Sequence, residues 1–166
     1  MYTDIIKKLI SRKLSIATAE SITGGFISKL ITDVPGSSEI FEEGFITYSD
    51  EIKKTILGVD PSLIDTYGVV SKEVAKDMAV KLKSLTGKDI CISTTGNAGP
   101  NVCDNKPVGR VYIGINYFDD IKVYECDFSG DRNEVREKTA IKVFEEIDKL
   151  ISIWLFYKKF YLSFWL

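Results

Sequence analysis

Two adjacent serines, a tyrosine and a lysine pair stand close together in a chain that has no histidine. The segment PGSSEIFEEGFITYSDEIKK contains Ser37, Ser38, Tyr48 and Lys53. A serine hydroxyl is a weak nucleophile unless a neighbouring base takes its proton. Since histidine is absent, a lysine or a carboxylate must act as that base. The segment also fits a plainer interpretation, a Pro-Gly turn followed by a strand tyrosine and a solvated helix lysine.

A second candidate is TAESITGG, residues 18–25, which lies between an apolar run and a helical pattern. Backbone amides at a helix N-terminus favour anions, and glycines let them approach a ligand closely. The spacing is not one of the recognised phosphate-binding signatures, so a simple capping turn is the alternative. The candidate binding residues here are Glu20, Ser21, Thr23, Gly24 and Gly25.

Two further segments could contact a ligand. In STTGNAGP an apolar strand runs out into a glycine-rich loop, and ligands of open α/β sheets lie beyond the carboxyl ends of strands. Its candidate residues are Thr95, Gly96, Asn97, Ala98 and Gly99. In SGDR, Arg132 begins the last predicted helix. A lone arginine is usually a surface residue, but facing a phosphate it would be a bidentate donor.

The elements that must position these residues alternate along the chain. Helical spacing of apolar residues and β-branched runs predict helices at 4–13, 26–34, 51–58, 71–86 and 131–151, and strands at 14–20, 44–48, 89–95, 111–118 and 121–128. Asp50 is the expected cap of the third helix, and Asp119-Asp120 the turn of a late hairpin. This order predicts an α/β fold with a mixed, mostly parallel sheet covered by helices on both faces.

Composition limits the class of protein. A chain of 166 residues is one domain by length. With 22 basic and 24 acidic residues the net charge is -2, which provides no electrostatic footprint for nucleic acid. Cys91, Cys103 and Cys126 are an odd, scattered set, so we expect neither a disulfide framework nor a metal site. The N-terminus has no apolar signal core, and we expect a cytoplasmic protein.

The C-terminal segment ISIWLFYKKFYLSFWL, residues 151–166, is strongly aromatic. It is shorter than the roughly 20 apolar residues that span a bilayer, and two lysines interrupt it. We favour packing on this domain or on a sister subunit, and therefore expect a homo-oligomer. An interfacial membrane anchor and a disordered end are the alternatives.

Several motifs fall in the order of one known family. TAESITGG, TDVPGSSEIFEEGFITYSDEIKK, GVDPSLIDTYGVVSKEVAKDMA, STTGNAGP, KPVG and SGDR together resemble the C-terminal domain of the competence/damage-inducible protein CinA. That family includes stand-alone nicotinamide mononucleotide amidohydrolases. The resemblance covers about residues 1–150, and leaves the aromatic tail, 151–166, outside it.

The resemblance implies a three-layer α/β/α sandwich that hydrolyses nicotinamide mononucleotide to nicotinate mononucleotide and ammonia without a cofactor. It places the nucleophile at Ser38, with Tyr48, Lys53 and Thr95 in support, and the arginine of the family's GDR motif at Arg132. We expect Arg132, together with amides of the Thr23–Gly25 turn, to hold the substrate phosphate. Residues alone do not decide between Ser37 and Ser38. A buried lysine with a lowered pKa could take the serine proton, and a nicotinoyl ester would form on the serine.

The chain departs from the family pattern at three places. Ile22 replaces a cysteine, Asp50 replaces an asparagine, and Asn97 replaces an apolar residue in a loop that then lacks its usual glycines. A carboxylate at position 50 would raise the pKa of a neighbouring lysine and oppose its role as a base. These departures favour a second hypothesis, a nucleotide- or partner-binding module of the same fold with weak catalysis.

Overall fold

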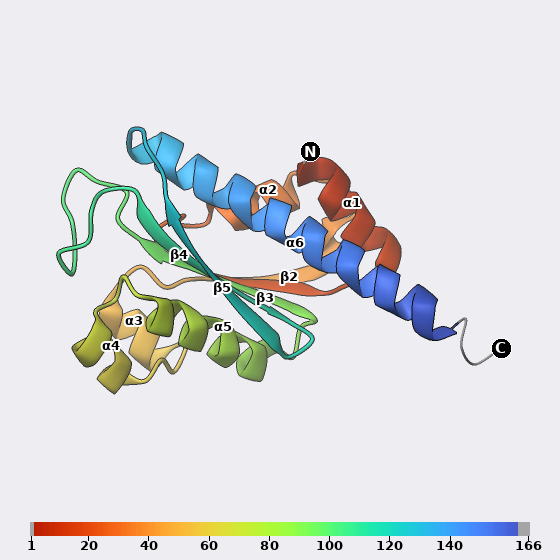
Figure 1. Ribbon diagram of the computed structural model, residues 1–166, viewed down its shortest axis with the longest axis horizontal. Coiled ribbons are helices and arrows are strands. Elements are labelled where there is room, and N and C mark those ends of the chain that lie inside the picture. Colours follow the sequence, from red (N-terminus) through yellow and green to blue (C-terminus); the bar gives the residue numbers. More distant parts are fainter. Residues whose placement is uncertain (1, 163–166) are drawn as a thin grey trace.

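A five-stranded sheet in the order β2-β1-β3-β4-β5 forms the centre of the computed structural model (Figure 1). The structure describes the backbone of residues 2–162 and the side chains of residues 2–153. The strands are β1 (Ile16–Glu20), β2 (Phe41–Ile46), β3 (Ile90–Gly96), β4 (Arg110–Tyr117) and β5 (Asp120–Asp127). β1 pairs in parallel with β2 and β3, whereas β4 is antiparallel to both β3 and β5. The mixed sheet is therefore confirmed, with only β4 running against the other strands.

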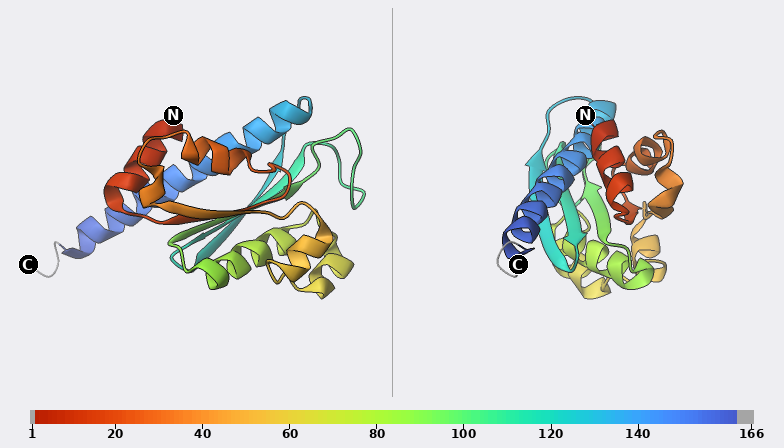
Figure 2. Two further views of the ribbon diagram at one scale, coloured as in Figure 1. Left: turned by 180° about the vertical axis from the view of Figure 1, so that it is seen from behind. Right: turned by 90° about the vertical axis from the view of Figure 1, so that its right-hand side faces the viewer.

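Helices cover both faces of the sheet, which confirms the three-layer α/β/α prediction (Figures 1 and 2). One layer contains α1 (Tyr2–Arg12), α2 (Phe26–Thr32) and α6 (Arg132–Leu162), and the other contains α3 (Asp50–Thr55), α4 (Pro61–Tyr67) and α5 (Lys72–Thr86). A short 3-10 turn, η1 (Ser37–Glu39), precedes β2. The α6 backbone continues through position 151, where the aromatic tail begins. Of the tail, residues 151–166, the side chains of 151–153 are described: Ile151 is buried, whereas Ser152 and Ile153 are exposed. The packing predicted for the other side chains of the tail lies outside the described residues.

Two local predictions need correction. Ser49, not Asp50, is the N-cap of α3, because its side chain accepts a hydrogen bond from Ile52 N. The strand expected at 44–48 begins and ends earlier, at 41–46, so Tyr48 lies beyond the end of β2. Asp50 is therefore the first residue of α3, and Tyr48 lies in the short segment between β2 and α3.

The first and last helices pack against each other in the same layer. Apolar side chains of α1 and α6 share one buried cluster, and the rings of Tyr2 and Phe144 lie 5.9 Å apart between centroids. Lys8 Nζ also donates to Asp148 Oδ1 at 2.7 Å. Residues almost a whole chain apart thus complete one side of the core.

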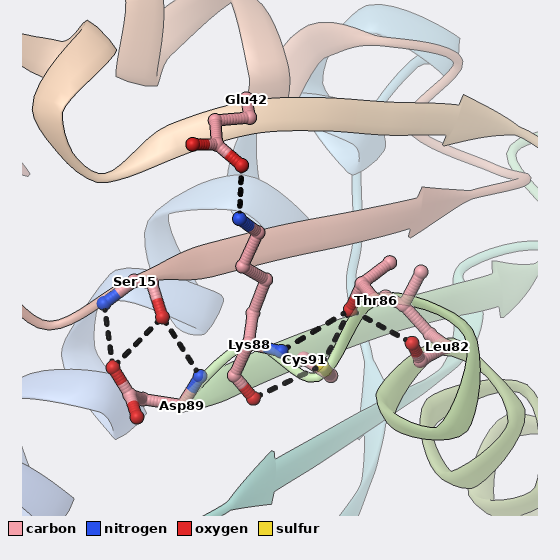
Figure 3. A network of polar contacts seen from close by, with 7 residues as sticks. All are labelled: Ser15, Glu42, Leu82, Thr86, Lys88, Asp89 and Cys91. Carbon is pink, nitrogen blue, oxygen red and sulfur yellow. Dashed lines mark hydrogen bonds and ion pairs between the residues drawn. The ribbon is translucent and has the colours of Figure 1, made fainter.

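Polar contacts hold the amino ends of three strands together (Figure 3). The Asp89 carboxylate, just before β3, accepts from Ser15 N at 2.9 Å and Ser15 Oγ at 2.8 Å, just before β1. Lys88 forms an ion pair with Glu42 of β2. These contacts are structural, and a cavity lies at the opposite, carboxyl end of the three strands.

Candidate active site

A cavity of about 310 Å³ lies where β1, β2 and β3 end. Because parallel strands end at the same edge, the segments that follow them converge there. Figure 1 shows the loop after β3, the start of α6 and the α3–α4 pair at this end of the molecule. The cavity is lined by Ser21, Ile22, Tyr48, Asp50, Lys53, Val69, Val70, Thr95, Gly96, Asn97, Ala98, Gly99, Pro100, Asn101, Cys103 and Arg132.

Lys53 and Ser21 form the central contact of the cavity. The Lys53 side chain projects from α3 and is only 2 % exposed. Its Nζ donates to Ser21 Oγ at 3.2 Å. Ser21 follows β1 directly, so the carboxyl end of β1 meets α3, the helix that follows β2. A hydroxyl within hydrogen-bonding distance of a buried amine is the arrangement that a serine–lysine pair requires.

The charge of Lys53 is under opposing influences. Burial lowers the pKa of this amine below its ordinary value, since the charged form loses hydration. Electrostatic interactions with Asp50, Cys103 and Asp104 oppose that shift. Asp50 Oδ1 is 4.0 Å from Nζ, and its side chain is 56 % exposed. Burial has the larger effect, so the net direction favours a neutral amine.

Arg132 and Tyr48 lie together on the cavity wall. Arg132 Nη2 donates to the Tyr48 hydroxyl and Nη1 to the carbonyl of Gly99, both at 2.8 Å. The guanidinium therefore joins the segment after β2, the loop after β3 and the start of α6. A guanidinium has five N–H donors, so these two contacts leave capacity for an anionic ligand. Within the described side chains, no hydrogen bond joins Tyr48 to Ser21 or Lys53.

The structure does not bring Ser38 to this cavity. Ser38 is exposed in η1, and Ser37 beside it is buried at 8 % exposure. Both precede β2, whereas Tyr48 and Lys53 follow it. β2 has six residues, and at about 3.3 Å per residue its two ends lie about 20 Å apart. The role predicted for Ser38 is therefore corrected, and Ser21, predicted only to bind substrate, is the serine that meets the lysine.

The anion site expected at the start of α2 is already filled by Glu20. This side chain is 1 % exposed, and its carboxylate accepts from the amides of Gly25, Ile27 and Ser28 and from Ser28 Oγ, at 2.6 to 3.0 Å. Gly24 N donates to Ser21 O at 3.1 Å. The predicted phosphate contact is therefore wrong for the amides of Gly24 and Gly25, because Ser21 O and the Glu20 carboxylate already accept from them.

Thr95 and Thr23 are placed by hydrogen bonds of their own. Thr95 Oγ1 donates to the carbonyl of Val69 at 2.7 Å, so its single proton is not free to stabilise developing negative charge. Thr23 Oγ1 and Thr94 Oγ1 lie 2.9 Å apart in the interior. Thr95 lines the cavity as predicted, but as a residue that fixes its wall. Thr23 lies outside the lining.

The loop residues 96–99 border the cavity as predicted, and their geometry explains their types. A Cβ on Gly96 would lie 2.7 Å from Arg110 O, so only glycine fits between the two strands. Ala98 is buried, and Gly99 presents its carbonyl to Arg132. Asn97 turns its side-chain amide toward the following segment, where it bonds to Cys103 and Lys106. It therefore contacts the loop rather than presenting its amide to a ligand.

Sequence reasoning missed several residues that complete the cavity. Val69 and Val70 come from the segment between α4 and α5, and Asn101 and Cys103 from the loop after β3. No pattern in the sequence joins these four residues to a site, and only their place in the fold identifies them. Across the described residues, no group of three or more His, Cys, Asp or Glu side chains could hold a metal ion. No helix among them is long and apolar enough to cross a bilayer.

Comparisons with known proteins agree on one family. Residues 1–151 match the model of the CinA C-terminal domain. A CinA-like protein of Thermotoga maritima is 42% identical over 149 residues, and so is a competence-damage inducible protein of Caldanaerobacter subterraneus. Each match covers 89% of this chain but 36% of the relative, so the chain spans about a third of the length of these relatives.

Solved structures agree with the fold. The competence damage-inducible protein A of Klebsiella pneumoniae superposes with a TM-score of 0.88 at 25% identity, covering 92% of this chain and 98% of that one. A CinA superfamily protein of Escherichia coli superposes with a TM-score of 0.82 at 26% identity, covering 92% and 90%. Motif order, architecture and these matches agree, and the chain belongs to the CinA C-terminal domain family.

Proposed function

We propose that this domain is an amidohydrolase that removes the carboxamide nitrogen of nicotinamide mononucleotide, with Ser21 as nucleophile and Lys53 as its base. One observation carries the proposal: the buried Lys53 amine lies 3.2 Å from the Ser21 hydroxyl, and both line the cavity. The earlier assignment of the nucleophile to Ser38 is replaced, while Lys53 keeps the role that the family resemblance implies.

This pair and water account for every proton transfer of the reaction. Neutral Lys53 takes the Ser21 proton as Oγ attacks the carboxamide carbon. The C–N bond then breaks, ammonia leaves with the proton from Lys53, and a nicotinoyl ester remains on Ser21. Water attacks the ester carbon, again giving its proton to Lys53. Cleavage of the ester returns that proton to Ser21 and releases the nicotinate nucleotide.

Developing negative charge on the carbonyl oxygen requires donors. Within the described part of the chain, the backbone N–H groups of Ile22 and Ala98 donate no hydrogen bond, and both residues line the cavity. The amide that follows a nucleophile often serves this purpose. We assign the oxyanion contact to these amides in place of the Thr95 hydroxyl, whose proton is donated to Val69.

Arg132 is the proposed contact of the substrate phosphate. A phosphate prefers bidentate donors, and this guanidinium faces the cavity beside Tyr48. Arg132→Ala should weaken binding of the nucleotide much more than binding of free nicotinamide. Calorimetric titration with both ligands measures this, and an equal loss for the two would place the phosphate elsewhere.

Asp50 favours the second candidate function, a binding module with weak catalysis. Its carboxylate, 4.0 Å from Lys53 Nζ, stabilises the charged amine that cannot act as a base. The two functions differ in turnover and not in ligand. Ammonia release therefore separates them, since a pure binding module would bind nicotinamide mononucleotide and leave it intact.

The decisive experiment is ammonia release from nicotinamide mononucleotide by the purified protein. Ser21→Ala should lower the rate by at least about a thousandfold, because a covalent route is lost. Ser38→Ala is the matched control and should retain the wild-type rate, since that hydroxyl lies in η1 outside the cavity. If Ser38→Ala is inactive and Ser21→Ala is active, the nucleophile assignment is wrong. Absence of turnover in the wild type would reject the amidase function itself.

A further inference from the structure

We infer that Asn97 and Asp104 are positioning residues that fasten the segment after Pro100 as a fixed wall of the cavity. The consequence for catalysis rests on the proposed function, whereas the fastening itself is a property of the fold. This segment lacks the glycines expected in the family, and its side chains take over the task of shaping it. Both residues act through others, since their polar side-chain atoms bond to backbone groups of the protein.

Asn97 holds the segment from the side of β3. Its side chain is buried at 4 % exposure. Nδ2 donates to the carbonyls of Cys103 and Lys106, both at 3.0 Å, and Oδ1 accepts from Cys103 N at 2.9 Å. Its backbone adds two bonds, to Arg110 O at 2.9 Å and from Gly109 N at 2.7 Å. An apolar side chain at position 97 could form none of the three side-chain bonds.

Asp104 holds the segment from the opposite side, against the residues between α4 and α5. Its Oδ2 accepts from Val70 N at 2.7 Å. The carboxylate lies over Gly68, where a Cβ would come within 2.4 Å of Asp104 Cγ. Gly68 also has φ +80, a conformation that favours glycine. The glycine at position 68 and the aspartate at position 104 thus fit each other.

The two fastenings meet at the cavity. Val69 O accepts a hydrogen bond from the Thr95 hydroxyl, and Val70 N donates one to Asp104. The segment 68–70 therefore binds both β3 and the loop that follows it. Cys103, held twice by Asn97, lines the cavity together with Val70. The wall is therefore built before any ligand arrives, which lowers the ordering cost of binding.

The wall also contributes charge near Lys53. The charged or titratable groups that influence this amine are Asp50 on its own helix and Cys103 and Asp104 on the wall, while Tyr48 and Arg132 line the same cavity. Asp104 favours the protonated amine. Asn97 carries no charge, so the two residues can be told apart by their effects on the pH dependence of the rate.

Hydrogen exchange of the free protein, followed by mass spectrometry, tests the fastening without any substrate. Asn97→Leu should speed exchange of the Cys103 amide by about tenfold or more, since its hydrogen bond to the Asn97 side chain is lost and one such bond contributes about a factor of ten. Asp104→Ala should do the same for Val70. Val102→Ala, an exposed residue of the same segment outside the lining, is the control and should leave exchange unchanged.

Steady-state kinetics with nicotinamide mononucleotide test the consequence. Asn97→Leu should raise KM by about tenfold and lower kcat by less, with the midpoint of the pH–rate profile unchanged. Asp104→Asn keeps an acceptor for Val70 but removes the charge, so its pH–rate rise should move to lower pH. Asp65→Asn, an exposed carboxylate on α4 outside the lining, is the charge control and should not move it.

The outcomes separate this inference from the proposed function. Unchanged exchange in Asn97→Leu and Asp104→Ala would overturn the fastening, whatever the activity. Faster exchange in these variants, together with no ammonia release by the wild-type protein, would support the fastening and reject the amidase function. If Asn97→Leu does not fold, the Asp104 variants decide by the same exchange and pH measurements.

Discussion

Lys53 is the residue whose charge state governs the proposed reaction. Only the neutral amine accepts the serine proton, so kcat/KM should rise with pH through the folded-state pKa, which burial lowers. Asp50→Asn removes a carboxylate that stabilises the ammonium form and should move this rise to lower pH. A pH–rate profile measures both. Glu51→Gln, an exposed neighbour outside the lining, serves as control, and a shift of the Asp50 variant to higher pH would contradict the argument.

The burial of the Lys53 amine should lower the free energy of unfolding of the protein. Its folded pKa lies below the unfolded value, so between the two values the unfolded chain binds more protons and the free energy of unfolding rises with pH. Lys53→Met removes the buried amine and keeps most of its volume. We expect it to raise the free energy of unfolding at neutral pH by on the order of 1 kcal/mol while abolishing turnover. Urea unfolding of both proteins checks this, and a less stable variant would show that the amine contributes net favourable contacts.

The choice of serine shows what a sequence can and cannot reveal at this scale. The family resemblance and the absence of histidine led to Lys53, which the structure places in the cavity. The assignment of the nucleophile to Ser38 was wrong because the length of β2 separates Ser38 from Tyr48 and Lys53 in space. A usable signal was present: Ser21, Tyr48 and Thr95 all stand at or just beyond the carboxyl ends of strands, whereas Ser38 stands before one.

Among the elements, α2 depends on a single buried carboxylate. Glu20 accepts four hydrogen bonds at the start of this seven-residue helix. Glu20→Ala leaves those donors without acceptors and should lower the free energy of unfolding by about 3 kcal/mol or more. Chemical denaturation measures the loss, with Glu51→Ala at an exposed position of α3 as control. A change within about 0.5 kcal/mol, as for ordinary surface substitutions, would mean that water replaces the carboxylate.

Elements were predicted best where the pattern was long. The helix at 71–86 agrees with α5 (Lys72–Thr86), because Ser71 caps it and Gly87 ends it in the left-handed conformation. The helix α4 was not predicted, although Asp60 caps it, Pro61 begins it and Gly68 ends it. Two turns with no buried side chain lack the apolar periodicity on which the prediction relied.

For the whole molecule, the aromatic C-terminus raises the question of assembly. Ile151 is the last fully buried side chain of α6 among the described ones. Removal of residues 153–166 should therefore leave the unfolding midpoint and ammonia release near their wild-type values. We expect the full chain to be a homo-oligomer and the shortened chain to have a lower mass in light scattering. Unfolding of the shortened protein would instead assign those residues to the core.

The pairing of the first helix with the last governs how the chain acquires its structure during synthesis. Ile5, Ile6 and Leu9 share their core with Phe144, Ile147 and Ile151, which a ribosome makes more than a hundred residues later. At ordinary rates of translation that interval is on the order of ten seconds. Throughout it, the apolar face of the N-terminal helix lacks its final partner, so a chain arrested before α6 is a natural client for chaperones and proteases.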